Sequence, residues 1–464
     1  MIKNFINDKE IWETIESSRN KDKNEIKDIL KKAEECNSLS LYETAVLLQT
    51  NDNVLIEEIF TLAKKVKEKI YGNRIVVFVP LYVTNECSNI CLYCAFRADN
   101  TDLKRKTLNY KEIIEEVEII QKQGHKRVLA VYGETLNFGV DKIVESVEAI
   151  YATKTEPAGE IRRVNINSAP MSVEDFKVLS KAPIGTYQCF QETYHKETYE
   201  KVHVYGQKSD YLWRLNALHR AQEAGLDDVA VGVLYGLYDP YFETLAMLRH
   251  SFELENIFGV GPHTISFPRL EPALGADLST HPPYMVDDNL FKKIIAVLRL
   301  AVPYTGMILS TRESAELRHE LINLGVSQIS AGSKTSPGSY HESDINIPDT
   351  QQFKIGDERL LDEVVYDLIG MELIPSFCTA CYRLGRHGKN FMDMAKNQHI
   401  KSFCQPNAIL TFAEYLEDYA CDKTKAAGYE LIKKLMANLS NPNQQNKVSC
   451  DLHCIKNGTR DIIY

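Results

Sequence analysis

The chain has 464 residues, 44% of them hydrophobic and 25% charged, which is the balance of a globular protein with a large buried core. Its net charge of −10, from 54 Lys and Arg against 64 Asp and Glu, repels nucleic-acid phosphates and anionic lipid. No apolar run approaches the ~20 residues of a membrane span, and the first residues lack the apolar core of a signal peptide. We therefore expect a cytoplasmic protein that binds neither nucleic acid nor membranes.

Two patterns follow each other along the chain. Residues 1–71 show apolar positions at helical spacing, whereas from Gly72 short β-rich runs alternate with longer amphipathic stretches. The predicted strands, each followed by a predicted helix, are 75–83, 127–132, 163–167, 184–191, 228–234, 263–268, 306–310 and 327–331. Eight such pairs predict a closed parallel barrel, the (β/α)8 or TIM-type architecture of the α/β class.

Three regions are expected: a helical extension over 1–71, the barrel over 72–372 and a C-terminal region over 373–464. The last region has helical patterns near 408–419 and 428–437 and holds six of the 11 cysteines. Clustered cysteines in a reducing compartment are more often metal ligands or catalytic groups than disulfides. The C-terminal region is therefore predicted to be a helical domain that binds metal.

The first cysteine cluster follows the first predicted strand directly. Cys87, Cys91 and Cys94 have spacings of three and two intervening residues, and three thiolates can bind an iron–sulfur cube while leaving its fourth iron without a protein ligand. A loop after a barrel strand lies at the catalytic, C-terminal face. The alternatives are a zinc knuckle or incidental buried thiols.

This cysteine spacing resembles the signature of radical S-adenosylmethionine (SAM) enzymes. The resemblance implies a [4Fe–4S] cluster whose open iron is chelated by SAM, and cleavage of SAM to a 5′-deoxyadenosyl radical. Polar residues that close successive strands are then candidate SAM contacts, although each alone could be a solvated polar residue. They are Tyr132, Gly133, Glu134, Ser168 and Glu192, with Arg214 in the following helix as a partner for the SAM carboxylate.

A second cysteine set, Cys378, Cys381 and Cys404, again supplies three thiolates, so zinc and an incompletely ligated iron–sulfur cluster both remain candidates. Barrel helices run antiparallel to the strands, so Cys378 follows the last helix at the N-terminal mouth. His263 begins the sixth strand at the same mouth. Strand lengths place the two cysteine sets more than ~20 Å apart, at opposite ends of the barrel.

Longer stretches of sequence extend the resemblance to one group of radical SAM enzymes. Together with both cysteine sets, residues 184–195, 259–269, 301–313, 328–333 and 375–383 are similar to the radical SAM tyrosine lyases of [FeFe]-hydrogenase maturation. The resemblance implies cleavage of the Cα–Cβ bond of L-tyrosine to p-cresol and dehydroglycine, which yields CO and cyanide on an auxiliary Fe–S cluster. His263 would hold an additional iron, and free cysteine would complete the product. The implied partners are other hydrogenase maturases and an electron donor such as flavodoxin or ferredoxin.

Two residues are candidates for binding tyrosine. Arg312 at the end of the seventh strand can bind a carboxylate through two parallel hydrogen bonds, unless it forms an ion pair with Glu313 or Glu316. Ser330 on the eighth strand could orient the amine, with Ser333 as its competitor.

The chain departs from the family pattern at 135–136, where Thr-Leu follows Gly-Glu, and at 202–208, where two prolines are missing. Both departures are predicted to affect SAM-side loops, as in a divergent paralogue. The rival functions are the 2-iminoacetate synthase of thiamine biosynthesis, which lacks the C-terminal cysteine set, and a non-catalytic Fe–S scaffold.

Overall fold

The structure is a computed structural model that describes residues 3–341, 349–397, 400–439 and 441–464. Within these ranges, every helix is too short or too polar to cross a lipid bilayer.

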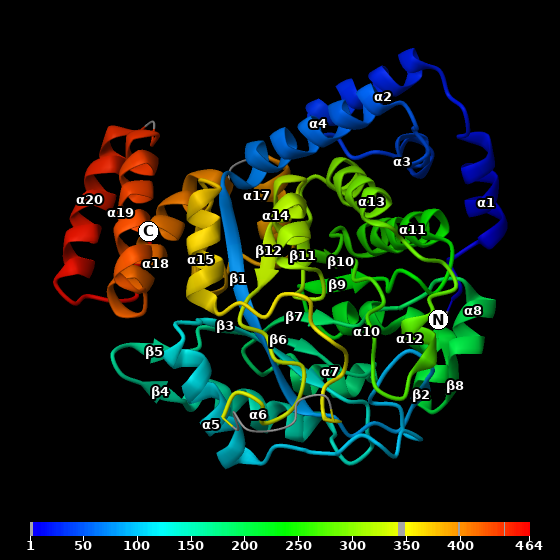
Figure 1. Ribbon diagram of the computed structural model, residues 1–464, viewed down its shortest axis with the longest axis horizontal. Helices are drawn as coiled ribbons and strands as arrows, with labels where there is room; N and C mark the ends of the chain where they lie inside the picture. Colours follow the sequence, from blue (N-terminus) through cyan, green and yellow to red (C-terminus); the bar gives the residue numbers. More distant parts are fainter. Residues whose placement is uncertain (1–2, 342–348, 398–399, 440) are drawn as a thin grey trace.

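Eight parallel strands close into a barrel, which confirms the predicted architecture (Figure 1). Closure comes from β1 pairing with β12, where Val77 lies opposite Ile329. The barrel strands are β1 (Arg74–Thr84), β3 (Arg127–Tyr132), β6 (Arg163–Asn167), β7 (Ile184–Gln188), β9 (Val229–Gly232), β10 (Thr264–Ser266), β11 (Gly306–Leu309) and β12 (Gln328–Ser330). Almost all of their residues are buried, as in strands that are covered on both faces.

The helices that follow the strands surround the barrel. They are α5 (Tyr110–Lys122), α6 (Val140–Ala152), α7 (Val173–Leu179), α9 (Tyr211–Leu215), α10 (Ala217–Glu223), α11 (Pro240–Phe258), α13 (Asp288–Ala301), α14 (Ala315–Asn323) and α15 (Leu361–Gly370). The helix predicted to follow the fourth strand is divided into α9 and α10 at Asn216, whose side-chain amide donates to the Lys3 carbonyl at 3.1 Å. The helix is interrupted where it binds the N-terminal segment.

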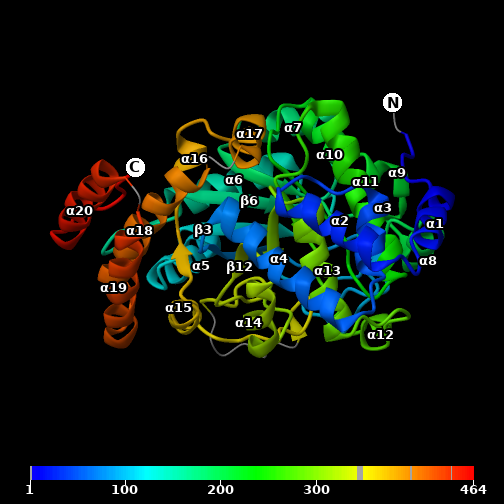
Figure 2. The ribbon, with the colours of Figure 1, turned by 90° about the horizontal axis from the view of Figure 1, so that it is seen from above.

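The N-terminal extension is helical, as expected. It comprises α1 (Asp8–Ser17), α2 (Lys23–Glu34), α3 (Leu41–Leu48) and α4 (Asn53–Tyr71). Three of these helices have an N-cap side chain that accepts backbone N–H groups of the first turn. The N-caps are Asp22 for α2, Ser40 for α3 and Asp52 for α4. Helices α2 to α4 form a layer over the end of the barrel where β1 begins (Figures 1 and 2).

The C-terminal region contains more structure than its sequence pattern indicated. A short strand, β13 (Ile374–Ser376), pairs with the start of β1, so the barrel sheet extends past the expected boundary at residue 372. The helices are α16 (Ala380–Arg383), α17 (Gly388–Lys396), α18 (Ile400–Asp418), α19 (Asp422–Ala437) and α20 (Pro442–Lys456). Helices α18 to α20 lie beside the barrel (Figure 2).

Helix α18 begins eight residues before the start expected from sequence and carries Pro406 in its interior. A proline normally interrupts a helix because it lacks an N–H and its ring crowds the preceding turn. Here almost every side chain of the helix is buried from Cys404 to Leu416, and this packing overrides the local preference. Cys404 consequently lies on a buried helix.

Candidate functional site

All the residues predicted for the first mouth line one cavity of about 190 Å³ at the C-terminal end of the barrel. They are Cys87, Cys91, Cys94, Tyr132, Gly133, Glu134, Ser168, Glu192, Arg214, Arg312 and Ser330. They come from seven separate segments of the chain, and barrel closure brings them together. The two residues of the first departure, Thr135 and Leu136, are not part of this lining, and Leu136 is 89% exposed.

The cysteine loop is held in place by segment 202–208, the second place where the chain differs from the family pattern. Within the loop, β2 (Ile90–Cys91) pairs antiparallel with β8 (His203–Tyr205), so segment 202–208 supports the loop directly. Asn89 adds two contacts, because its side-chain amide lies 3.6 Å from the Cys87 sulfur and donates to Glu134 at 2.8 Å. Burial raises the pKa of the Cys94 thiol to about 11, so these thiols release protons when they bind a metal.

Two carboxylates and two cations form a buried network beside these cysteines. Arg214 Nη1 lies 2.6 Å from Glu134 Oε1, and Lys208 Nζ lies 2.9 Å from Glu192 Oε1. Burial alone would raise the pKa of Glu134, but the charges of Arg214 and Lys208 outweigh burial and lower it. Arg214 therefore already has a carboxylate partner in the protein.

Sequence reasoning missed Asn89 and Lys208 as site residues. The only signal was their position, Asn89 inside the cysteine motif and Lys208 in the segment that departs from the family pattern. Lys208 lines the cavity and carries a positive charge, because its pairing with Glu192 offsets the cost of burial.

Gly133 is required by the close approach of two chain segments. A Cβ atom at this position would lie 2.2 Å from the Glu86 carbonyl oxygen. Gly133→Ala should therefore push the strand end away from the cysteine loop, destabilise the protein by about 1–3 kcal/mol and weaken SAM binding. Thermal unfolding and SAM titration measure the two effects.

Gly370→Ala is the matched control, because among the described residues no atom outside its own helix backbone and chain neighbours lies within 4 Å of the added Cβ, and alanine favours the helix end in which it lies. Unchanged stability and SAM affinity in Gly133→Ala would contradict the steric argument.

The substrate candidates lie on the other side of the same cavity. The ion pair of Arg312 with Glu313 or Glu316, which was the alternative to a ligand role, is not formed in the described ranges. Glu313 pairs with Arg269 instead. The Arg312 guanidinium stacks over the Phe353 ring at 3.4 Å, and burial lowers its pKa. Ser330 is buried and lines the cavity. A partly buried cation that forms no ion pair among the described residues favours an anionic ligand.

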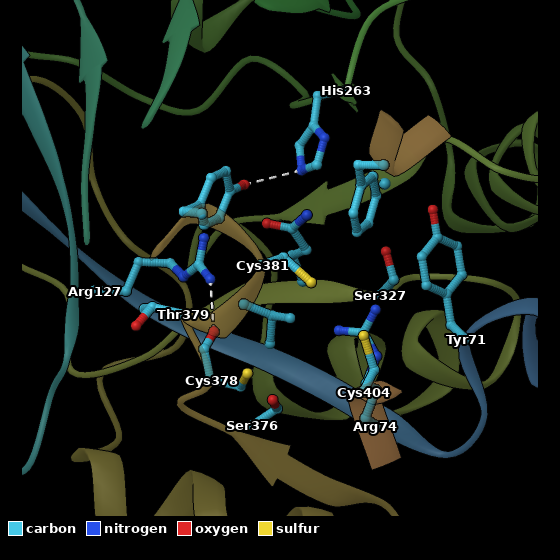
Figure 3. Close-up of a pocket in the computed structure, with 15 residues that line it drawn as sticks. Tyr71, Arg74, Arg127, His263, Ser327, Ser376, Cys378, Thr379, Cys381 and Cys404 are labelled. Carbon is cyan, nitrogen blue, oxygen red and sulfur yellow. Dashed lines mark hydrogen bonds between the residues drawn. The ribbon is translucent and has the colours of Figure 1, made fainter. Parts of the chain in front are cut away.

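The second cysteine set lies at the opposite mouth. Cys378, Cys381, Cys404 and His263 line one pocket, with Arg74 and Arg127 beside them (Figure 3). Arg74 at the start of β1 lines this pocket, whereas Tyr82 near the end of β1 lines the first cavity. Eight residues of extended strand span ~26 Å. The structure thus brings the two sets to opposite ends of one barrel.

The residues around this pocket fit a negatively charged cluster, since three thiols and two arginines line it. Several residues that line the pocket carry buried donors without a hydrogen-bond partner among the described residues, including Arg74 Nε, Arg127 Nε and Thr379 Oγ1. Unpaired donors around three thiols suit the sulfides of an iron–sulfur cluster.

Comparison with known proteins identifies the family. Residues 81–251 match the Radical SAM superfamily, and residues 266–374 match the Biotin and Thiamin Synthesis associated domain. The 2-iminoacetate synthase of Escherichia coli (strain K12) is 30% identical over 348 residues, which are 75% of this chain and 89% of that protein. The chain belongs to the radical SAM enzyme family that includes 2-iminoacetate synthase.

Two solved structures match almost the whole chain. A crystal structure of HydG, described as a maturase of the [FeFe]-hydrogenase, is 48% identical, has a TM-score of 0.96 and is covered in full, as is this chain. The HydG of Carboxydothermus hydrogenoformans is 41% identical with a TM-score of 0.84, over 97% of this chain and 99% of that one. The resemblance to the [FeFe]-hydrogenase maturases is thereby confirmed.

Membership in the radical SAM family implies a [4Fe–4S] cluster and SAM as cofactors. The residues at the first mouth fit both groups: Cys87, Cys91 and Cys94 can hold the cluster, and the strand-end residues surround a cavity that adjoins it. When bound, the cluster and SAM supply a 5′-deoxyadenosyl radical. A closed barrel keeps such a radical away from water.

Proposed function

We propose that this enzyme cleaves the Cα–Cβ bond of L-tyrosine and converts the smaller fragment to CO and cyanide for hydrogenase maturation. The observation that supports this proposal most is the presence of three cysteines at each of the two opposite mouths of one barrel. Each set is one ligand short of what a four-iron cluster requires. The atoms balance, since p-cresol and dehydroglycine together contain every atom of tyrosine. Dehydroglycine in turn divides into CO, hydrogen cyanide and water.

At the first mouth, the protein binds and orients the substrates. Cys87, Cys91 and Cys94 hold the SAM-binding cluster, while Glu134, Ser168 and Glu192 contact SAM through its polar groups. Arg214 reaches the SAM carboxylate while keeping its pairing with Glu134. Arg312, which has no carboxylate partner among the described residues, binds the carboxylate of tyrosine, and Ser330 orients the amine.

Only short stretches of two strands separate the two sites inside the barrel. Val76 and Gln328 line the second pocket, and Phe78 and Ser330, two residues further along the same strands, line the first cavity. The inner ends of the two spaces are thus separated by about 7 Å of strand. We infer that dehydroglycine crosses this gap inside the barrel, because an imine in bulk water would be hydrolysed.

The second pocket is the feature on which we base the choice between the two lyases. Full coverage by the HydG structure includes Cys378, Cys381 and Cys404, whereas the match to 2-iminoacetate synthase leaves out a quarter of this chain. We propose that these thiols hold the auxiliary cluster, with an additional iron on His263. Cysteine as cosubstrate, a flavodoxin or ferredoxin as reductant, other maturases as partners and a cytoplasmic location complete the proposal.

The test is an anaerobic assay of iron- and sulfide-reconstituted protein with SAM, tyrosine and dithionite. We expect p-cresol together with CO and cyanide. Cresol with glyoxylate but no CO would instead assign the chain to the 2-iminoacetate synthase activity. Absence of cresol would exclude both lyases and favour the scaffold function.

A further inference from the structure

Asp228 lies next to His263 and has no role in the proposed chemistry. It immediately precedes β9, is 4% exposed, and its Oδ1 lies 3.4 Å from His263 Nδ1. The same oxygen accepts the N–H of Gly388 at 3.0 Å. The other oxygen, Oδ2, has no hydrogen-bond partner among the described residues and lies 4.0 Å from Arg163 Nη2.

The opposite side of the imidazole faces the second pocket. His263 Nε2 lies 3.1 Å from the hydroxyl of Tyr382 (dashed in Figure 3), and the His263 ring packs on Phe391 at 4.8 Å between centroids. A carboxylate on the Nδ1 side of an imidazole favours an N–H on Nδ1, which leaves the Nε2 lone pair facing the pocket.

We propose that Asp228 is a positioning residue that makes His263 an iron ligand through Nε2. The proposal rests on the proposed function, in which His263 holds the additional iron. Histidine ligands commonly donate their second N–H to a carboxylate, which fixes the tautomer and makes the ligating nitrogen more basic. His263 Nδ1 is buried, has no hydrogen-bond partner among the described residues and has Asp228 Oδ1 3.4 Å away, so this carboxylate is placed to take its N–H.

Asp228 also connects this ligand to the helix that covers it. Gly388 is the first residue of α17, and Phe391 in the same helix is the residue packed on the His263 ring. One carboxylate therefore contacts the barrel histidine and the backbone of its cover. This arrangement holds the ring between a polar contact on one side and an apolar contact on the other.

The test compares Asp228→Asn with Asp227→Asn. Asparagine at 228 keeps the size and the acceptor for Gly388 but removes the charge that favours the Nδ1 proton. Asp227 is the matched control, because it pairs with His387 of the same covering segment at 2.8 Å and its side chain is 53% exposed. The readout is the affinity for iron in excess of sulfide in cluster-loaded protein, measured by competition with a ferrous chelator.

Asp228→Asn should weaken retention of the excess iron by about 10- to 100-fold, with unchanged thermal stability and unchanged hydrogen exchange over 388–396. Asp227→Asn should retain the iron as the wild type does, and His263→Ala should lose it. Equal retention in Asp228→Asn and wild type, with loss in His263→Ala, would overturn the role of Asp228 alone. Equal retention in His263→Ala and wild type would overturn the iron site itself, and with it this inference.

Discussion

Cys91→Ala should abolish SAM cleavage, and with it the formation of p-cresol, CO and cyanide. Cys91 is 5% exposed, lies in β2 and lines the first cavity. It is one of only three thiols there, so its loss leaves two ligands for a cluster that requires three from the protein. Release of 5′-deoxyadenosine and methionine from SAM under dithionite is the measurement.

Cys189→Ala is the matched control, because Cys189 is equally buried but lies outside the lining of this cavity. It should retain its cluster and cleave SAM. Normal SAM cleavage by Cys91→Ala would show that the first cysteine set is not the SAM-binding site, and the proposed function would fall with it.

Cys378→Ala should separate the two halves of the reaction. The change is made at the second pocket, at the opposite mouth of the barrel from Cys87, Cys91 and Cys94, so tyrosine cleavage should continue at its normal rate. CO formation should be lost, because two thiols do not hold the auxiliary cluster. Cresol is measured by chromatography and CO by binding to deoxyhaemoglobin in the same reaction.

Cys450→Ala provides the comparison for this variant. Cys450 lies in α20, is exposed and lines neither cavity, so the variant should make both products. Loss of cresol in Cys378→Ala would show that the two sites depend on each other, and undiminished CO would show that the second cysteine set has another purpose.

The structure explains why the two cysteine sets could be predicted from the sequence and several of their neighbours could not. A cysteine motif is local, since Cys87, Cys91 and Cys94 fall within eight residues and need only a loop. The partners of Asn89 and Lys208 are Glu134 and Glu192, which follow the strands β3 and β7. Nothing in the spacing of these residues along the chain indicates that they meet.

The same reasoning applies to the second pocket. The alternation of strands and helices placed His263 and Cys378 at one mouth, because strand direction and chain order determine which end of a barrel each residue reaches. Asp228 was not predicted, although it immediately precedes a predicted strand, because its contacts to His263 and Gly388 come from separate parts of the chain. Helix α18 was predicted too short, since the local effect of Pro406 was outweighed by burial.

The amino-acid sequence by itself determined the barrel and both thiol sets of this protein, because hydrophobic periodicity and cysteine spacing act over a few residues. Only the tertiary structure decided which charges pair within each site, that Arg312 lacks a carboxylate partner in the described ranges, and how closely the two cavities approach along β1 and β12. Those properties depend on side chains from distant strands, and their positions are set by barrel closure and packing rather than by local sequence.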